Sequence, residues 1–243
     1  MSARRFFLEG VRARGESVEI HGSDAHKIVN VLRLRTGDAI TAIDSGGTVF
    51  EASLSVEGGR VHVVLGAIET TAPIPSLRID VAQGLPKAQK MDFIIEKLTE
   101  LGVRTIWPLA SERAIARDVG DAKLSRWERL AKSAAQQSGR TDVPTVAKPI
   151  ALPELIQHFD EYDCVLIPWE AAPQDALRDR LPALLSGVER LLIVIGPEGG
   201  FSHGEIEKAT AGGAHPISLG SRILRTETAA LALVAVVNYA TSG

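Results

Sequence analysis

The sequence predicts an α/β protein in two parts, a small β-barrel over residues 1–72 and a mainly parallel α/β domain over residues 73–243. Three observations lead to this division. Short β-rich segments separated by turns fill residues 1–69, a Pro-containing segment follows at 70–76, and strand-like and helix-like segments then alternate. Such alternation is typical of a parallel sheet covered by helices.

The N-terminal part combines strands with one short helix. Strands are expected over residues 17–20, 39–44, 49–56 and 60–67, with a hairpin turn at Ser45-Gly46-Gly47-Thr48. A helix is expected over residues 23–32, with Ser23 or Asp24 as its cap and with Ile28, Val31 and Leu32 on one face.

The C-terminal part alternates strands and helices. Strands are expected over residues 77–82, 103–109, 164–168, 190–195 and 216–219. Helices are expected over residues 90–101, 123–138, 175–185, 202–211 and 226–240.

The last helix differs from the others because residues 229–237 are almost wholly apolar. A helix without a polar face must be buried, either in its own domain or against another subunit. Its position at the end of the chain favours a subunit interface. We therefore expect a homodimer held largely by this helix, with Val234 and Val237 in a dry contact either with their own domain or with the partner chain.

Composition excludes several classes of protein. Apolar residues make up 45% and charged residues 23% of the 243 residues, as in an average globular protein. There is neither a membrane-length apolar segment nor the apolar stretch of a signal peptide, so we expect a cytoplasmic protein without a membrane partner. Cys164 is the only cysteine and the six histidines lack ligand spacing, so no metal is expected.

The charge is unevenly distributed. The net charge is −3, yet residues 87–148 hold 12 Lys and Arg against 8 Asp and Glu, whereas residues 149–243 hold 6 against 12. Contact with a nucleic-acid backbone needs only a local positive face. The arginines that are candidates to contact phosphate are Arg4, Arg5, Arg33, Arg35 and Arg140. Ordinary solvated helix faces are the alternative explanation.

The clearest motif is Gly196-Pro197-Glu198-Gly199-Gly200-Phe201-Ser202, which follows a buried strand and precedes a helix. Ser202 and Glu205 form a capping box that fixes the helix start. The glycines allow a ligand to approach the main chain closely, beyond the carboxyl end of a strand. The spacing fits neither a dinucleotide fingerprint nor a P-loop. Glu198 would repel phosphate and tolerate a cation such as a sulfonium; a tight turn with nothing bound is the alternative.

A second strand end carries a similar signal. Leu219-Gly220-Ser221-Arg222-Ile223-Leu224-Arg225-Thr226-Glu227-Thr228-Ala229-Ala230 again joins a strand to a helix through a glycine. Two such strand ends in succession favour one shared pocket, although a plain loop with exposed arginines is also possible. Residues 166–171 and 136–140 add weaker signals.

These segments together resemble the small-subunit (16S) ribosomal RNA uracil-N3 methyltransferases of the SPOUT superfamily. Residues 91–103, 136–140 and 168–170 are similar to other signature segments of that family, and residues 26–38 resemble its PUA-like RNA-binding barrel. The resemblance implies a C-terminal trefoil knot, a rare exception to unthreaded topology. It also implies a homodimer and S-adenosylmethionine (SAM) bound by the knotted loops.

Carried over by position, the resemblance assigns cofactor contacts to three segments. These comprise Pro168, Trp169, Glu170, Gly196, Pro197, Glu198, Gly199, Gly200, Ser218, Leu219, Gly220, Ile223, Leu224, Arg225, Thr226 and Thr228. Methylation of uracil N3 requires loss of its proton and access to an unstacked base. Glu198 and Glu227 are candidate bases by location, although a helix N-terminus lowers the pKa of a carboxylate such as Glu198. Arg225 or Arg140 would stabilise negative charge on the uracil.

Two other classes of function stay open. A pure RNA-binding protein would have no use for SAM. A nucleotide-dependent enzyme would use the Gly-rich turn as a phosphate cradle, although the turn contains a glutamate and no lysine.

Overall fold

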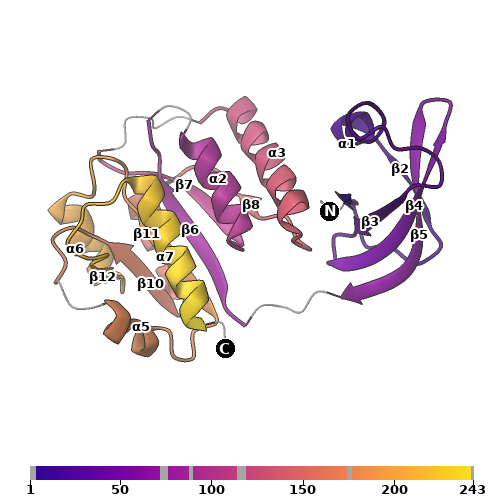
Figure 1. Cartoon of the computed structure of the whole chain (residues 1–243). Helices are drawn as coiled ribbons and strands as arrows, with labels where there is room; N and C mark the ends of the chain where they lie inside the picture. The colour runs from indigo at the N-terminus through magenta and orange to yellow at the C-terminus, as the bar shows by residue number, and fades with distance from the viewer. Residues whose placement is uncertain (1–3, 72–75, 88–89, 114–118, 174–176, 242–243) are drawn as a thin grey trace. The chain divides into compact units, whose positions relative to one another are not determined.

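Figure 1 shows the computed structural model of the chain, which describes residues 4–71, 76–87, 90–113, 119–173 and 177–241. The chain divides into two compact units. The first comprises Met1–Ile74 and Ala135–Asp142, and the second comprises Pro75–Ala134 and Val143–Gly243. The Pro-containing segment expected at 70–76 lies mostly outside the described residues. That residues 1–72 and 73–243 have separate functions stays a prediction.

A five-stranded sheet forms the first unit. Its order is β1 (Arg5–Phe7), β3 (Ala39–Ile43), β4 (Thr48–Glu57), β5 (Arg60–Thr71) and β2 (Ser17–Ile20). All pairs are antiparallel except β1 with β3, and the sheet curls into a half-barrel (Figure 1). The four expected strands are confirmed, and β1 is additional. Alternating side chains such as Phe50, Leu54 and Val63 fill the core.

The predicted helix over residues 23–32 is correct in place and wrong in detail. Helix α1 (Gly22–His26) continues as a π-helical turn, η1 (Lys27–Val31). Its N-cap is His21, without a side-chain cap bond, so neither Ser23 nor Asp24 is the cap.

The π turn also changes which side chains are buried. Ile28 is fully buried, but Val31 is 64% and Leu32 36% exposed. A π turn holds more residues than an α turn, so the α-helical spacing that placed Val31 and Leu32 on the face of Ile28 does not apply here. The turn ends at Arg33 in the left-handed region (φ 53°), after which Leu34 is buried.

The second unit contains a seven-stranded sheet in which every pair is parallel. The strand order is β12 (His215–Ile217), β10 (Cys164–Pro168), β11 (Arg190–Ile195), β6 (Arg78–Gly84), β7 (Thr105–Ala110) and β8 (Thr145–Val146), while β9 (Ile150–Ala151) also pairs with β7. The predicted parallel α/β architecture is therefore confirmed, with β8 and β9 as unpredicted short edge strands.

Helices cover both faces of this sheet. The core on one face includes residues of α2 (Lys90–Glu100), α3 (Asp121–Ser138), α5 (Leu177–Leu184) and α7 (Thr226–Thr241). The core on the other face includes residues of α4 (Leu152–Ile156), α6 (His203–Ala211) and the short helix η2 (Phe159–Glu161). Strand β11 is apolar throughout because Leu191 and Ile193 point to the first face and Leu192 and Val194 to the second.

Helix α7 lies beside α2 on the sheet (Figure 1). Val234 and Val237 are fully buried within the chain, so their expected dry contact is with their own domain. The opposite side of the helix exposes Val236 (45%) and Tyr239 (87%). Because the helix is apolar all round, its sequence could not show which side faces the sheet. No helix within the described residues is long and apolar enough to cross a membrane.

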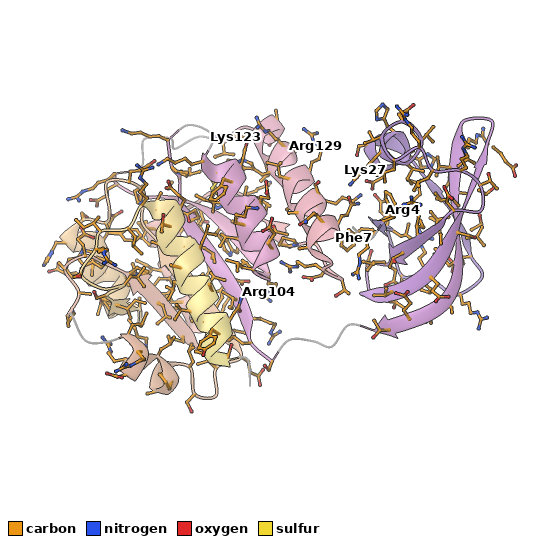
Figure 2. All side chains as sticks on the ribbon, viewed as in Figure 1. Arg4, Phe7, Lys27, Arg104, Lys123 and Arg129 are labelled. Atoms are coloured by element: carbon orange, nitrogen blue, oxygen red, sulfur yellow. The ribbon has the colours of Figure 1, made fainter. Side chains whose placement is uncertain are left out.

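An ionic cluster around the buried Asp80 joins the strands at the amino-terminal side of the sheet. Arg104, labelled in Figure 2, donates from Nε (2.9 Å) and Nη2 (2.5 Å) to the two oxygens of Asp80, and the Tyr162 hydroxyl donates to the same carboxylate at 2.9 Å. Burial raises the pKa of Tyr162, so its hydroxyl stays protonated as a donor. The buried Asp80 carboxylate therefore has hydrogen-bond partners for both of its oxygens. The candidate site lies at the opposite edge of the sheet, where the strands have their carboxyl ends.

Candidate cofactor site

A cavity of about 490 Å³ lies where β10, β11 and β12 end, in the size range of small-molecule sites. The segments that follow these three strands, together with the start of α2, supply its lining. The lining residues are Lys90, Pro168, Trp169, Glu170, Ile195, Gly196, Pro197, Glu198, Gly199, Gly200, Phe201, Ser218, Leu219, Gly220, Ser221, Arg222, Ile223, Leu224, Arg225, Thr226 and Ala229.

The predicted cofactor residues gather at this cavity, with one exception. Thr228 is exposed on α7 and is not among the lining residues. Lys90 lines the cavity and lies outside every segment that was predicted to form it. It lies about a hundred residues before the motifs in the sequence, and only the strand order brings it to them.

The Gly-rich turn has little room for side chains. A Cβ on Gly196 would lie 3.2 Å from the ring of Phe201, and one on Gly199 would lie 3.2 Å from Arg113. Gly200 adopts φ +65°, where an L side chain is strained, and a Cβ there would meet the Glu170 carboxylate at 3.3 Å. The turn therefore exposes main chain to the cavity because glycine occupies these positions.

Helix α6 begins as predicted. The Ser202 hydroxyl accepts from the Glu205 N–H (3.2 Å), and the Glu205 carboxylate accepts from the Ser202 N–H (2.8 Å), which confirms the capping box. The loop after β7 also holds the turn. The Glu112 N–H donates to Glu205 (2.8 Å), and Arg113 donates to the carbonyl of Gly199 (2.9 Å).

Glu198 is held on two sides. The Lys87 N–H donates to its carboxylate at 3.0 and 3.3 Å, and the Lys90 ammonium lies 3.4 Å away. Burial alone would raise the pKa of Glu198, but the hydrogen bonds from Lys87 and Lys90 outweigh it, and the pKa is lower than usual. A carboxylate with a lowered pKa is a weak proton acceptor, so Glu198 is better suited to stabilising a nearby cation.

Thr226 joins the two motifs. Its hydroxyl donates to the carbonyl of Gly196 at 2.5 Å and accepts from the amide of Gln83 at 2.8 Å. Gln83, at the end of β6, is fully buried. The neighbouring Gly84 is closely packed, since a Cβ there would lie 2.3 Å from the nitrogen of Pro197. The ends of β6 and β11 and the start of α7 thus share one hydrogen-bond network.

The arginines expected to contact RNA are placed outside the cavity lining. Arg4, Arg33 and Arg35 are exposed and Arg5 is half-buried. Arg140 forms an ion pair with Asp142 at 2.6 Å. On the exposed side of α3, Lys123 and Arg129 add positive charge (Figure 2).

The residues of the cavity fit SAM. Trp169, Leu219 and Leu224 offer apolar surface for a purine ring, and the glycine backbone offers N–H and C=O groups. The carboxylates of Glu170 and Glu198 suit a ligand with a sulfonium and an ammonium. Among the described residues, no group of three or more His, Cys, Asp or Glu could hold a metal ion.

The fold and the site define a parallel α/β protein that binds a small molecule in loops at the carboxyl ends of its strands. Comparison with known proteins agrees with this class of protein and identifies a family within it. Residues 73–238 match the family described as "RNA methyltransferase domain". The chain is 34% identical to ribosomal RNA small subunit methyltransferase E of Bacillus subtilis over 98% of this chain and 97% of that protein.

Two further relatives extend the comparison. The protein of the same name from Synechocystis is 32% identical over 91% of this chain and 73% of its own length. The crystal structure of the Neisseria gonorrhoeae protein of that name, bound to S-adenosyl methionine, superposes with a TM-score of 0.87 at 33% identity, covering 98% of this chain and 97% of that one.

The chain belongs to this family of RNA methyltransferases, together with the proteins named ribosomal RNA small subunit methyltransferase E. The resemblance seen in the motifs at 196–202 and 219–230 is thereby confirmed.

Proposed function

We propose that this protein uses SAM to methylate small-subunit (16S) ribosomal RNA, at N3 of a specific uridine. One observation carries the proposal. The Gly-rich turn and the segment 218–226 line one cavity with apolar, carboxylate and main-chain groups, in a chain that belongs to an RNA methyltransferase family. Relatives named as small-subunit enzymes, one of them solved with SAM, support the substrate and the cofactor.

The chemistry divides between cofactor and protein. SAM, when bound, supplies an electrophilic methyl group on a cationic sulfur. Glu170 and Glu198 would stabilise that positive charge. Arg225, exposed at the rim of the cavity, would stabilise the negative charge on a uracil that loses its N3 proton. The target base must also leave its stack to reach the cavity.

The first unit would bind RNA. We propose that its curled sheet is PUA-like and that Arg4, Arg5, Arg33 and Arg35 contact phosphates, with Arg140 as a further contact. The exposure of Arg4, Arg33 and Arg35 supports this role. The proposed substrate implies work in the cytoplasm, where small ribosomal subunits are assembled.

Two features of the second unit complete the proposal. The family to which the chain belongs supports a trefoil knot in its C-terminal part, in which the segments 196–200 and 218–226 would be the knotted loops. A homodimer is supported by the apolar side of α7 that carries Val236 and Tyr239. No specific observation favours a pure RNA-binding protein or a nucleotide-dependent enzyme.

Calorimetric titration with SAM tests the cofactor. We expect one SAM per chain for the wild type and no measurable binding for Gly199→Val, because a β-branched side chain would collide with Arg113 and block approach to the turn. Gly204→Val is the matched control, since a Cβ on Gly204, within α6, meets nothing within 4 Å. A wild type that binds ATP but not SAM would contradict the proposal.

A further inference from the structure

Lys90 is the first residue of α2, and its ammonium lies between two carboxylates. The Nζ atom is 3.4 Å from Oε1 of Glu198 and 3.4 Å from both oxygens of Glu227. The Lys90 side chain is 36% exposed and lines the cavity, whereas the Glu227 side chain is only 15% exposed. The cation is therefore shared by two partly buried anions at the edge of the site.

The three residues come from three separate segments at the carboxyl edge of the sheet. Lys90 follows β6, Glu198 lies in the Gly-rich turn after β11, and Glu227 lies in the first turn of α7. Segments 196–200 and 218–226 form much of the cavity wall. The Lys90 ammonium thus links the Gly-rich turn, on one side of the cavity, to helix α7, which follows the segment 218–226 on the other side.

The contact of Lys90 with Glu198 and Glu227 differs from an ordinary surface ion pair, because one positive charge lies between two negative charges. Two carboxylates that approach the same point repel each other, and the repulsion is strong where water is partly excluded. The Lys87 N–H also binds Glu198, but it is the Lys90 ammonium that lies within 3.4 Å of both carboxylates. Without the ammonium, the turn and the start of α7 would carry like charges facing each other.

We propose that Lys90 is a positioning residue of the cofactor site, which holds the Gly-rich turn against the start of α7 and so keeps the cavity in its binding geometry. This inference rests on the proposed binding of SAM. The main-chain groups of Gly196, Gly199 and Gly200 move with the turn that contains Glu198. Displacements on the order of 1 Å are enough to weaken a preorganised site.

The test compares Lys90→Met, Lys90→Gln and Lys90→Arg by calorimetry with SAM, using the full-length protein. Loss of a charge-assisted contact is expected to weaken SAM binding on the order of tenfold in the Met and Gln variants. The Arg variant is expected to keep most of the affinity because it keeps the cation. Lys97→Met is the matched control, because Lys97 lies on the same helix and also bridges two carboxylates, Glu96 and Glu100, outside the cavity lining.

A double variant separates positioning from direct contact with the ligand. In Lys90→Met/Glu227→Gln the two facing carboxylates are reduced to one, so binding is expected to recover at least partly towards the wild type. If the double variant stays as weak as Lys90→Met, Lys90 contacts the ligand itself and the positioning role is wrong.

Two other results have distinct meanings. Wild-type affinity in Lys90→Met and Lys90→Gln, with unchanged thermal unfolding, would overturn the inference while leaving the proposed function intact. Absence of SAM binding by the wild type would instead overturn the proposed function, on which the inference depends.

Discussion

The polar side chains beneath the Gly-rich turn connect segments that are far apart in the sequence. Gln83 is fully buried, and its amide reaches the Thr226 hydroxyl, which in turn reaches the Gly196 carbonyl. Buried polar groups are costly unless they are paired, so such a chain of bonds fixes the relative position of its members. The cavity wall formed by Gly196 and Thr226 is therefore fixed by these hydrogen bonds as well as by the ion pairs of Lys90.

We predict that Thr226→Val lowers both stability and SAM affinity. Valine has nearly the same shape but leaves the Gln83 amide and the Gly196 carbonyl without this partner. The free energy of unfolding should fall by roughly 1–3 kcal/mol, the cost of an unsatisfied buried group. Urea unfolding and SAM calorimetry measure the two effects.

Thr241→Val is the control on the same helix, because the Thr241 hydroxyl bonds locally to the carbonyls of Val237 and Asn238, near the exposed end of α7. Its stability should change little. Equal stability of the Thr226 and Thr241 variants would contradict a structural role for the Gln83–Thr226–Gly196 chain.

The sequence predicted the local parts of the site but not the links between them. A glycine after a buried strand is a local signal, so the turn at 196–200 and the segment at 218–226 could be identified. Lys90 and Gln83 carry no such signal, because their function depends on β6 lying next to β11 in the sheet. Sheet order is a non-local property that hydrophobic pattern does not show.

At the scale of helices and strands, prediction succeeded where burial and pattern agree. Strands such as Arg190–Ile195 are short apolar runs because both of their faces are covered, and their bounds were found correctly. The π turn at Lys27–Val31 was missed because it breaks the angular spacing on which helix prediction depends. The short strands β8 and β9 have two residues each, too few for any period.

Helix α7 gives an element-scale prediction from two neighbouring valines. Val234 is fully buried against the sheet, whereas Val236 is 45% exposed on the opposite side. Val234→Asp buries an unpaired charge and should cost about 3–5 kcal/mol, enough to unfold a marginal domain. Val236→Asp should leave the fold intact and dissociate the proposed homodimer.

Thermal unfolding and multi-angle light scattering measure these two outcomes. The expected pattern is a folded monomer for Val236→Asp and loss of the folded state for Val234→Asp. A wild type that is monomeric at micromolar concentration would show that the exposed side of α7 is not a dimer interface.

At the scale of the whole molecule, each of the two units has its own core. The second unit contains the complete described lining of the cavity, and the first carries the exposed arginines Arg4, Arg33 and Arg35. This distribution agrees with one unit that holds the cofactor and another that binds the RNA backbone. The net charge of −3 does not indicate an RNA-binding unit, because phosphate contact depends on the local charge of a surface and not on the total.

Methyl transfer tests the central claim most directly. The protein is incubated with SAM labelled on its methyl group and with 16S ribosomal RNA, either free or within small subunits that lack the modification, and labelled fragments are analysed by mass spectrometry. The account predicts one methyl group per RNA, on N3 of a single uridine, with the wild type and none with Gly199→Val. SAM binding without transfer to either substrate, or transfer to a ribose or another base, would contradict it.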